Sequence, residues 1–136
     1  MQKLFLGLLF LPVFLFSQFT LTVHVGNVKT SSGNISIAVY DNEQGFLEFD
    51  HVLKSNTGKA QKGITTVELS DLPQGLYALA VFHDENENGH LDTNFLGIPK
   101  EAVGFSNAKM KTFGPPSYKE CSFLVDSNKD LTVNFK

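Results

Sequence analysis

Apolar and polar residues alternate along several short stretches of this chain. The alternation runs from Phe19 to Val25, from Ile35 to Val39, from Cys121 to Val125 and from Leu131 to Phe135. Because successive side chains of a β-strand point to opposite faces, a period of two predicts a strand with one buried face. Leu76 to Phe82 is apolar at nearly every position, which is typical of a central strand covered on both faces.

A weaker stretch, His51–Ser55, and a clearer one, Ile64–Leu69, complete a set of seven predicted strands. Turn-forming residues separate the strands at short intervals, as in the tight turn at Leu72–Gly75. No stretch predicts a convincing amphipathic helix. We therefore expect an all-β fold, a seven-stranded antiparallel sandwich with Greek-key connections.

The first 17 residues have the pattern of a secretory signal peptide. Lys3 precedes an apolar run from Leu4 to Phe16, which as a helix would reach only roughly 20 Å against a hydrocarbon core of about 30 Å. We predict cleavage after Ser17, which leaves a single domain over residues 18–136 with no membrane span, exported to the periplasm or the extracellular space. A retained membrane anchor is the alternative.

Composition excludes some classes of function. All 11 basic residues are lysines, there are 14 acidic residues, and the formal net charge is −3. Without a basic face or guanidinium groups, we expect no nucleic-acid partner. The single cysteine, Cys121, cannot form an internal disulfide, and we expect it to be a small buried hydrophobic residue in preference to a reactive thiol.

The long irregular segment 84–118 begins with an acidic stretch, Asp84–Asp92. Oxygen-bearing side chains occupy its first, third, fifth and ninth positions, and Gly89 at the sixth allows the positive φ of a tight loop. Ca²⁺ prefers six to eight such oxygens. The predicted ligands are the side chains of Asp84, Asn86, Asn88 and Asp92 and the backbone carbonyl of His90, with a weak dissociation constant of about 10⁻⁴–10⁻³ M.

Other interpretations of this stretch stay open. Asn88-Gly89 is also a strong signal for a bare hairpin turn. Phe95 stands at the twelfth position, where an EF-hand loop has a bidentate glutamate. His83 and His90 flank the loop and offer a zinc or copper site as a minor alternative.

Aromatic residues are spread along the rest of the long segment. Phe95, Phe105, Phe113 and Tyr118 either pack it onto the sandwich or form a weak ligand-binding surface, for example for a sugar. Gly104–Ala108 is similar to a nucleophile elbow around Ser106, but the final glycine of that motif is replaced by alanine. We expect no enzymatic activity.

A set of short motifs runs through the second half of the chain. They are Val81–Asn86, Gly89, Leu91–Phe95, Gly97–Glu101, Gly104–Asn107 and Phe113–Ser117, with Leu72–Tyr77 before them. Together these motifs resemble the DUF2141 family, whose members are exported bacterial proteins of uncharacterised function, although Glu87 and Val103 depart from the family pattern. The resemblance covers essentially the whole mature chain; it implies a transthyretin-like or immunoglobulin-like sandwich, and it implies no established activity.

These observations predict an exported, non-enzymatic binding or structural module of uncharacterised role. Its acidic loop would be stabilised by Ca²⁺, and its partner would be an unidentified protein or glycan. The alternative is a small-ligand or carbohydrate-recognition domain that uses the aromatic surface.

Overall fold

The computed structural model of the protein describes residue 12 and residues 15–136. The predicted signal peptide, residues 1–17, therefore lies mostly outside the described residues. Leu15 and Phe16 are exposed, and the first strand begins at Gln18. None of the described helices has the length and apolar character needed to cross a membrane.

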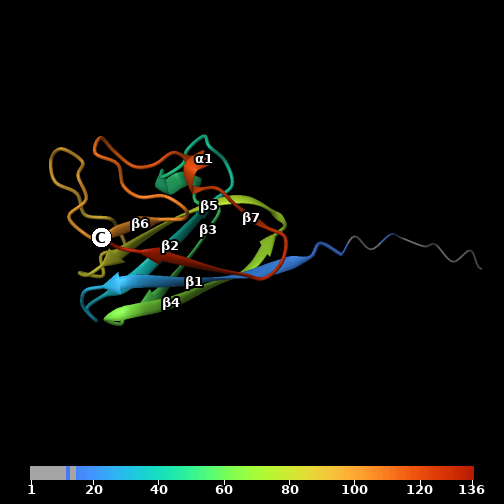
Figure 1. Cartoon of the computed structure of the whole chain (residues 1–136), viewed down its shortest axis with the longest axis horizontal. Helices are drawn as coiled ribbons and strands as arrows, with labels where there is room; N and C mark the ends of the chain where they lie inside the picture. Colours follow the sequence, from blue (N-terminus) through green and yellow to red (C-terminus); the bar gives the residue numbers. More distant parts are fainter. Residues whose placement is uncertain (1–11, 13–14) are drawn as a thin grey trace, which may run out of the picture.

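Strands make up most of the regular structure (Figure 1). The only helical elements among the described residues are a 3₁₀ turn and a single α-helical turn. The elements are β1 (Gln18–Val28), β2 (Asn34–Tyr40), η1 (Phe49–His51), β3 (Lys54–Lys59), β4 (Gly63–Pro73), β5 (Gly75–Asp84), β6 (Val103–Phe105), α1 (Tyr118–Cys121), β7 (Phe123–Val125) and β8 (Lys129–Asn134).

The strands form two sheets. One has the order β4-β1-β8, in which β1 is antiparallel to β4 and parallel to β8. The other has the order β3-β2-β5-β6, with every pair antiparallel. The short strand β7 pairs with the first three residues of β5. The fold is therefore mostly β, with one mixed and one antiparallel sheet.

This arrangement corrects the expected set of seven antiparallel strands. The β1–β8 pair is parallel, a property that an alternating pattern does not reveal because the pattern gives a strand's faces and not the direction of its partner. An eighth strand, β6, lies inside the segment 84–118. Residues 49–51 form η1, so β3 begins at Lys54 instead of His51.

The strand β6 escapes prediction because it is short and contains Gly104. A Cβ atom at this position would come within 2.6 Å of the Val133 side chain on β8. Only glycine allows the two sheets to approach this closely here. Gly104, which in the sequence is typical of a loop, is thus required by the packing of β6 against β8.

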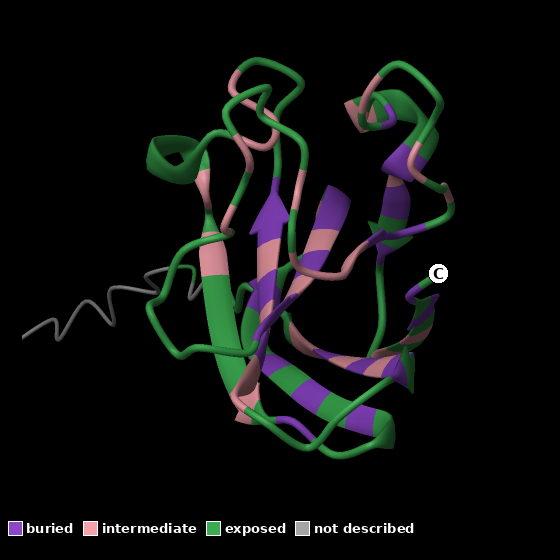
Figure 2. Ribbon diagram, turned by 90° about the vertical axis from the view of Figure 1, so that its left-hand side faces the viewer, coloured by how far each residue is buried: buried purple, intermediate pink, exposed green. Residues whose placement is uncertain are grey.

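Inward-facing side chains from both sheets share one hydrophobic core. Buried and less buried positions alternate along β1, β2 and β4, as the sequence predicts (Figure 2). Many members of this core are regularly spaced branched residues, whose burial favours the packing of the two sheets. They include Leu21, Val23, Val25, Ile35, Ile37, Val39, Val67, Leu69, Leu79, Val81 and Val133.

A second, smaller cluster attaches the end of the long segment to β5. Ala78, Phe105 and Cys121 are buried together, and Phe46 and Tyr118 pack around them. Burial raises the pKa of the Cys121 thiol to about 11. The expectation that this cysteine is a small buried residue is confirmed.

Candidate functional site: an acidic loop beside a groove

Asp84 is the last residue of β5 and is almost completely buried, with 2% of its surface exposed. One carboxylate oxygen accepts a hydrogen bond from Asn88 N–H (3.1 Å), and the other accepts one from Gly89 N–H (2.8 Å). Gly89 has a φ of +76°, which turns its N–H back toward the end of the strand. The carboxylate therefore holds the loop closed from inside.

Asp92 has a similar role on the outer side of the loop. Its two oxygens accept hydrogen bonds from the side-chain amides of Asn86 (2.7 Å) and Asn88 (2.9 Å). The amide oxygens of these asparagines accept in turn from backbone N–H groups of Asn88 (3.3 Å) and His90 (2.9 Å). Three of the predicted ligands thus meet side by side, and all of their oxygens accept hydrogen bonds within the loop.

Glu101 is a loop residue that the spacing of oxygen-bearing side chains did not predict as part of the site. Its carboxylate accepts from Glu85 N–H (3.2 Å) with one oxygen and from Asp92 N–H (3.1 Å) with the other. It therefore joins the start and the end of the acidic loop. The only signal in the sequence is its place in the family motif Gly97–Glu101, because nothing in its spacing links it to Glu85.

The predicted calcium ligands have been brought into one loop, but their donors are arranged for hydrogen bonding. Across the described part of the chain, no group of three or more His, Cys, Asp or Glu side chains is placed to hold a metal ion. The oxygens of Asp84 and Asp92 face N–H groups. Because a cation attracts oxygen atoms and repels N–H dipoles, binding would require the two asparagine amides to turn over.

The structure divides the four predicted ligand-binding aromatics. Phe95 and Phe113 are almost fully exposed, whereas Phe105 belongs to the second hydrophobic cluster, with 7% of its surface exposed. Tyr118 packs against that cluster and donates its hydroxyl hydrogen to the carbonyl of Leu76 (2.9 Å). Two of the four therefore support the packing interpretation, and two remain available to a ligand.

The outer face of the five-stranded sheet forms the floor of a groove of about 1270 Å³. Its walls come from the loop that contains η1, from the acidic loop with the hairpin after it, and from residues 110–115. Asp84 stands at one end of the floor and Tyr40 at the other, on β5 and β2. The acidic loop is therefore one wall of a larger concave surface.

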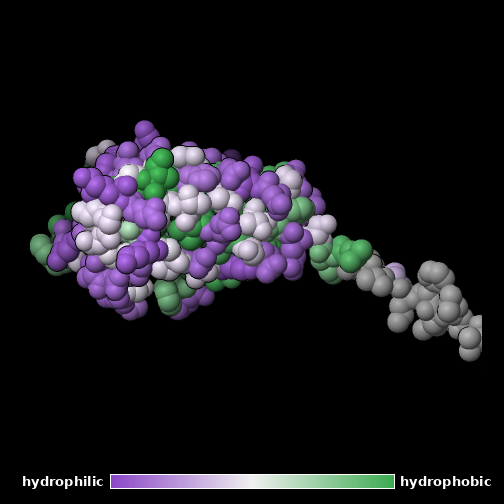
Figure 3. All heavy atoms as spheres, turned by 90° about the horizontal axis from the view of Figure 1, so that it is seen from below, coloured by the Kyte–Doolittle hydropathy of each residue, from purple (hydrophilic) through white to green (hydrophobic). Residues whose placement is uncertain are grey.

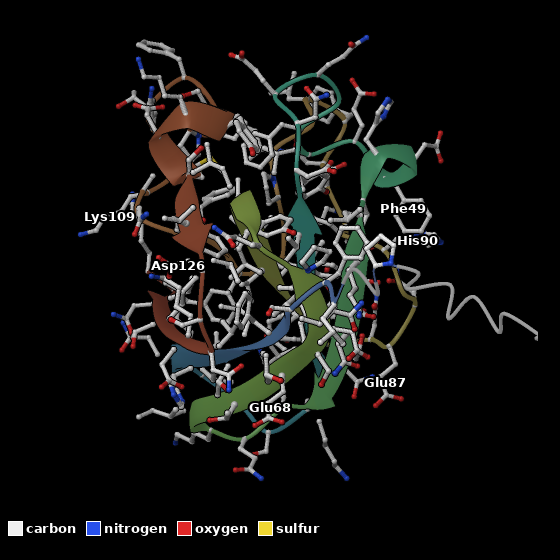
Figure 4. All side chains as sticks on the ribbon, turned by 90° about the vertical axis from the view of Figure 1, so that its right-hand side faces the viewer. Phe49, Glu68, Glu87, His90, Lys109 and Asp126 are labelled. Carbon is white, nitrogen blue, oxygen red and sulfur yellow. The ribbon has the colours of Figure 1, made fainter. Side chains whose placement is uncertain are left out.

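Exposed apolar side chains gather around this groove. We call six of them the apolar rim. Phe49 in η1 and His90 in the acidic loop lie side by side, with ring centroids 6.2 Å apart (Figure 4). The side of the molecule seen in Figure 3 is by contrast mostly hydrophilic. The rim residues are Phe49, Leu53, Leu91, Leu96, Ile98 and Phe113.

Residues 23–134 match the model of a family described as an uncharacterized protein conserved in bacteria, DUF2141. The chain belongs to the DUF2141 family. This confirms the resemblance inferred from the motifs. No curated protein and no solved structure matches the chain.

The acidic loop, Glu101 and the apolar rim all fall within the DUF2141 match. The family description assigns no activity to any of them.

Two other polar groups of this DUF2141 protein have contacts that bear on catalysis. Ser106 Oγ donates to the carbonyl of Cys121 (2.5 Å) and accepts from Leu79 N–H (2.9 Å), which are contacts of a buried structural hydroxyl. On the outer face of the other sheet, the ring of His24 lies between Thr66 Oγ1 (3.0 Å) and Asp130 Oδ1 (3.3 Å). Sequence spacing did not predict this second group, because its members come from three strands.

Proposed function

We propose that this protein is an exported, non-enzymatic binding module whose ligand site is the groove on the five-stranded sheet. The observation that supports this most is the apolar rim. Exposed apolar side chains that gather on one concave surface are typical of interaction sites. Elsewhere on the two sheets the exposed large apolar side chains are fewer: Ile64, and the cross-strand pair of Leu76 and Leu124.

The hydrogen bonds of the acidic loop support the same proposal. Asp84, Asp92 and Glu101 together fix the wall beside the groove. The hairpin that follows is equally constrained, because Asn94 Oδ1 accepts from Leu96 N–H (2.9 Å) and Ile98 N–H (3.0 Å). A wall that is ordered before the ligand arrives lowers the entropic cost of binding.

The assignment as a non-enzyme rests on the two hydroxyl groups described above. Ser106 is buried and bonded to backbone groups. Thr66 has a histidine neighbour, but its hydroxyl lies on the exposed face of β4. An acyl-transfer site holds its nucleophile in a water-excluded position beside oriented N–H donors.

A thermal-shift screen tests the binding function directly. Oligosaccharides, single-chain amphiphiles and extended peptides would be added to the mature protein, and at least one class should raise the melting temperature. Ala38→Phe, which fills the groove floor, should remove that rise. Thr132→Phe on the outer face of the other sheet is the matched control and should retain it. If no class raises the melting temperature, the binding function is wrong.

Export and the finer fold class are part of the same proposal. Lys3, the apolar run after it and the start of β1 at Gln18 support cleavage after Ser17. The chain crosses between the two sheets from β1 to β2, from β3 to β4 and from β4 to β5, which supports a Greek-key sandwich of the transthyretin or immunoglobulin kind. N-terminal sequencing of the exported protein should begin at Gln18, and a retained Met1 in the membrane fraction would contradict export.

Calcium binding at the acidic loop is a second proposal, favoured by the meeting of Asn86 and Asn88 at Asp92. Turning both amides over would present two more oxygens beside that carboxylate. Millimolar Ca²⁺ should then raise the melting temperature. Asn88→Ala should abolish the rise, whereas Asn42→Ala, in the loop after β2, should retain it. An identical melting curve in Ca²⁺ and in EDTA would contradict this proposal and leave the groove proposal intact.

A further inference from the structure

We infer that the groove binds the hydrocarbon chain of a single-chain amphiphile and leaves the head group in water. This inference rests on the proposed binding function and adds the chemical class of the ligand.

The floor of the groove is built for a chain that lies flat on the sheet. In the register of the strands, Ser55, Ala38 and Ala80 stand side by side on β3, β2 and β5. Their side chains share the outer face, because residues directly opposite each other point the same way. All three line the groove. Small side chains in a row leave a shallow channel that runs across the strands.

The sides of this channel are apolar. Phe82 and Val103 are directly paired neighbours on β5 and β6, and both line the groove beside the small residues. The apolar rim borders them, with Leu96 and Ile98 exposed on the constrained hairpin. A hydrocarbon chain placed in the channel would cover these side chains and remove their surface from water, which is favourable in proportion to the apolar area covered.

Several polar groups that line the groove already have partners within the protein, which favours an apolar ligand over a sugar. The hydroxyls of Ser36 and Thr57 bond to each other (3.3 Å). Both oxygens of Asp84 face backbone N–H groups of the acidic loop. A sugar needs several free planar side chains to bond its hydroxyls, whereas an alkyl chain needs none.

The two lysines that line the groove are occupied as well. Lys111 Nζ lies 2.8 Å from the carboxylate of Glu120, and Lys54 Nζ donates to the carbonyl of Ser70. Neither is directed to an anionic head group. We therefore expect affinity to depend on chain length and to change little with the charge of the head group.

The volume also fits an elongated ligand. About 1270 Å³ exceeds the roughly 300–1,000 Å³ of a compact small-molecule pocket. The groove is open along its mouth, since its walls are three separate loops. A chain can lie along such a groove while one end stays in solvent.

Fluorescence of N-phenyl-1-naphthylamine, a neutral apolar probe, tests the inference on the mature protein. The probe should brighten on binding, and dodecanol and dodecanoate should displace it with similar affinity, whereas octanol should be weaker. Leu96→Ser should weaken binding roughly fivefold, because one partly covered rim side chain is lost. Leu124→Ser makes the same change at an exposed leucine outside the groove and should leave binding unchanged. Circular dichroism should confirm that both variants fold.

Several outcomes would overturn the inference. Equal effects of the two leucine variants would place the probe outside the groove. Binding to phosphatidylglycerol vesicles without displacement by dodecanol would mean a membrane surface instead of a single chain. A melting-temperature rise with an oligosaccharide or peptide alone would replace the ligand class while retaining the binding function. If no ligand of any class gave a response with the mature protein, both the amphiphile inference and the proposed binding function would be overturned.

Discussion

The side-chain amide of Asn88 donates a hydrogen bond to the carboxylate of Asp92 across 2.9 Å. In the sequence, both residues are candidate oxygen ligands for one cation. In the structure, the amide N–H occupies the position that a cation would take beside the carboxylate. The carboxylates of the acidic loop consequently have hydrogen-bond partners within the loop, which an ion beside Asp92 would have to displace.

Asp84→Ala should destabilise the protein by about 2–4 kcal/mol, because two N–H groups of the loop lose a charged acceptor. Urea denaturation of the mature protein would measure this. Glu87→Asn is the matched control: it removes another carboxylate from the same loop but tolerates the left-handed backbone at that position (φ 57°). A similar loss in both variants would mean that overall loop charge matters, and not the contacts of Asp84.

Glu101→Ala should release the two ends of the acidic loop from each other. The backbone amides of Glu85 and Asp92 should then exchange with deuterium faster, while amides of β2 should keep their protection. The loss of stability should be about 1–2 kcal/mol. Lys100→Ala changes the neighbouring side chain and should leave both amides protected. Unchanged exchange in Glu101→Ala would show that Glu101 does not join the loop ends.

Stability should fall in acid through Glu120. Hydrogen bonds from the Lys111 ammonium and from Ser117 N–H lower the pKa of this carboxyl from 4.5 to about 2. Because the pKa is depressed in the folded state, the stabilisation is present above pH 4.5 and is lost as the pH falls toward 2. Melting temperatures measured across this range should fall less steeply for Glu120→Gln. If melting temperature fell equally with pH in the wild type and in Glu120→Gln, Glu120 would not be the source of the acid sensitivity.

Cys121 should be inert in the folded protein. It is fully buried, and its thiol has a raised pKa of about 11, so almost no thiolate is present at pH 8. Ellman's reagent should react slowly in buffer and rapidly in guanidinium chloride. Cys121→Ala should cost about 1 kcal/mol, as expected for a small buried side chain. Rapid reaction in buffer would contradict the packing of the second cluster.

The alternation in the sequence predicts most strands, because the period of side chains along a strand follows directly from backbone geometry. Leu21, Val23 and Val25 are all fully buried, as expected. The direction of β8 was not predictable in this way, and β6 was hidden by Gly104. In each case the deciding contact, such as the approach to Val133, joins residues far apart in the chain.

The candidate site was predictable to a similar extent. Composition and spacing identify the oxygen-rich residues of the acidic loop, and these do lie together. Their partners were not predictable, because the contacts to Gly89 N–H and Glu101 depend on how the loop turns. The apolar rim was also hidden, since Phe49 and Leu96 are distant in sequence and border the same groove only in the folded chain.

The parallel pairing of β1 with β8 joins the first and the last strand of the described residues. Until β8 is available, one edge of β1 has unsatisfied backbone groups. A chain with this topology cannot complete this sheet before residues 129–134 have been synthesised. A truncation of only the last eight residues should therefore leave an open sheet edge and a product that aggregates.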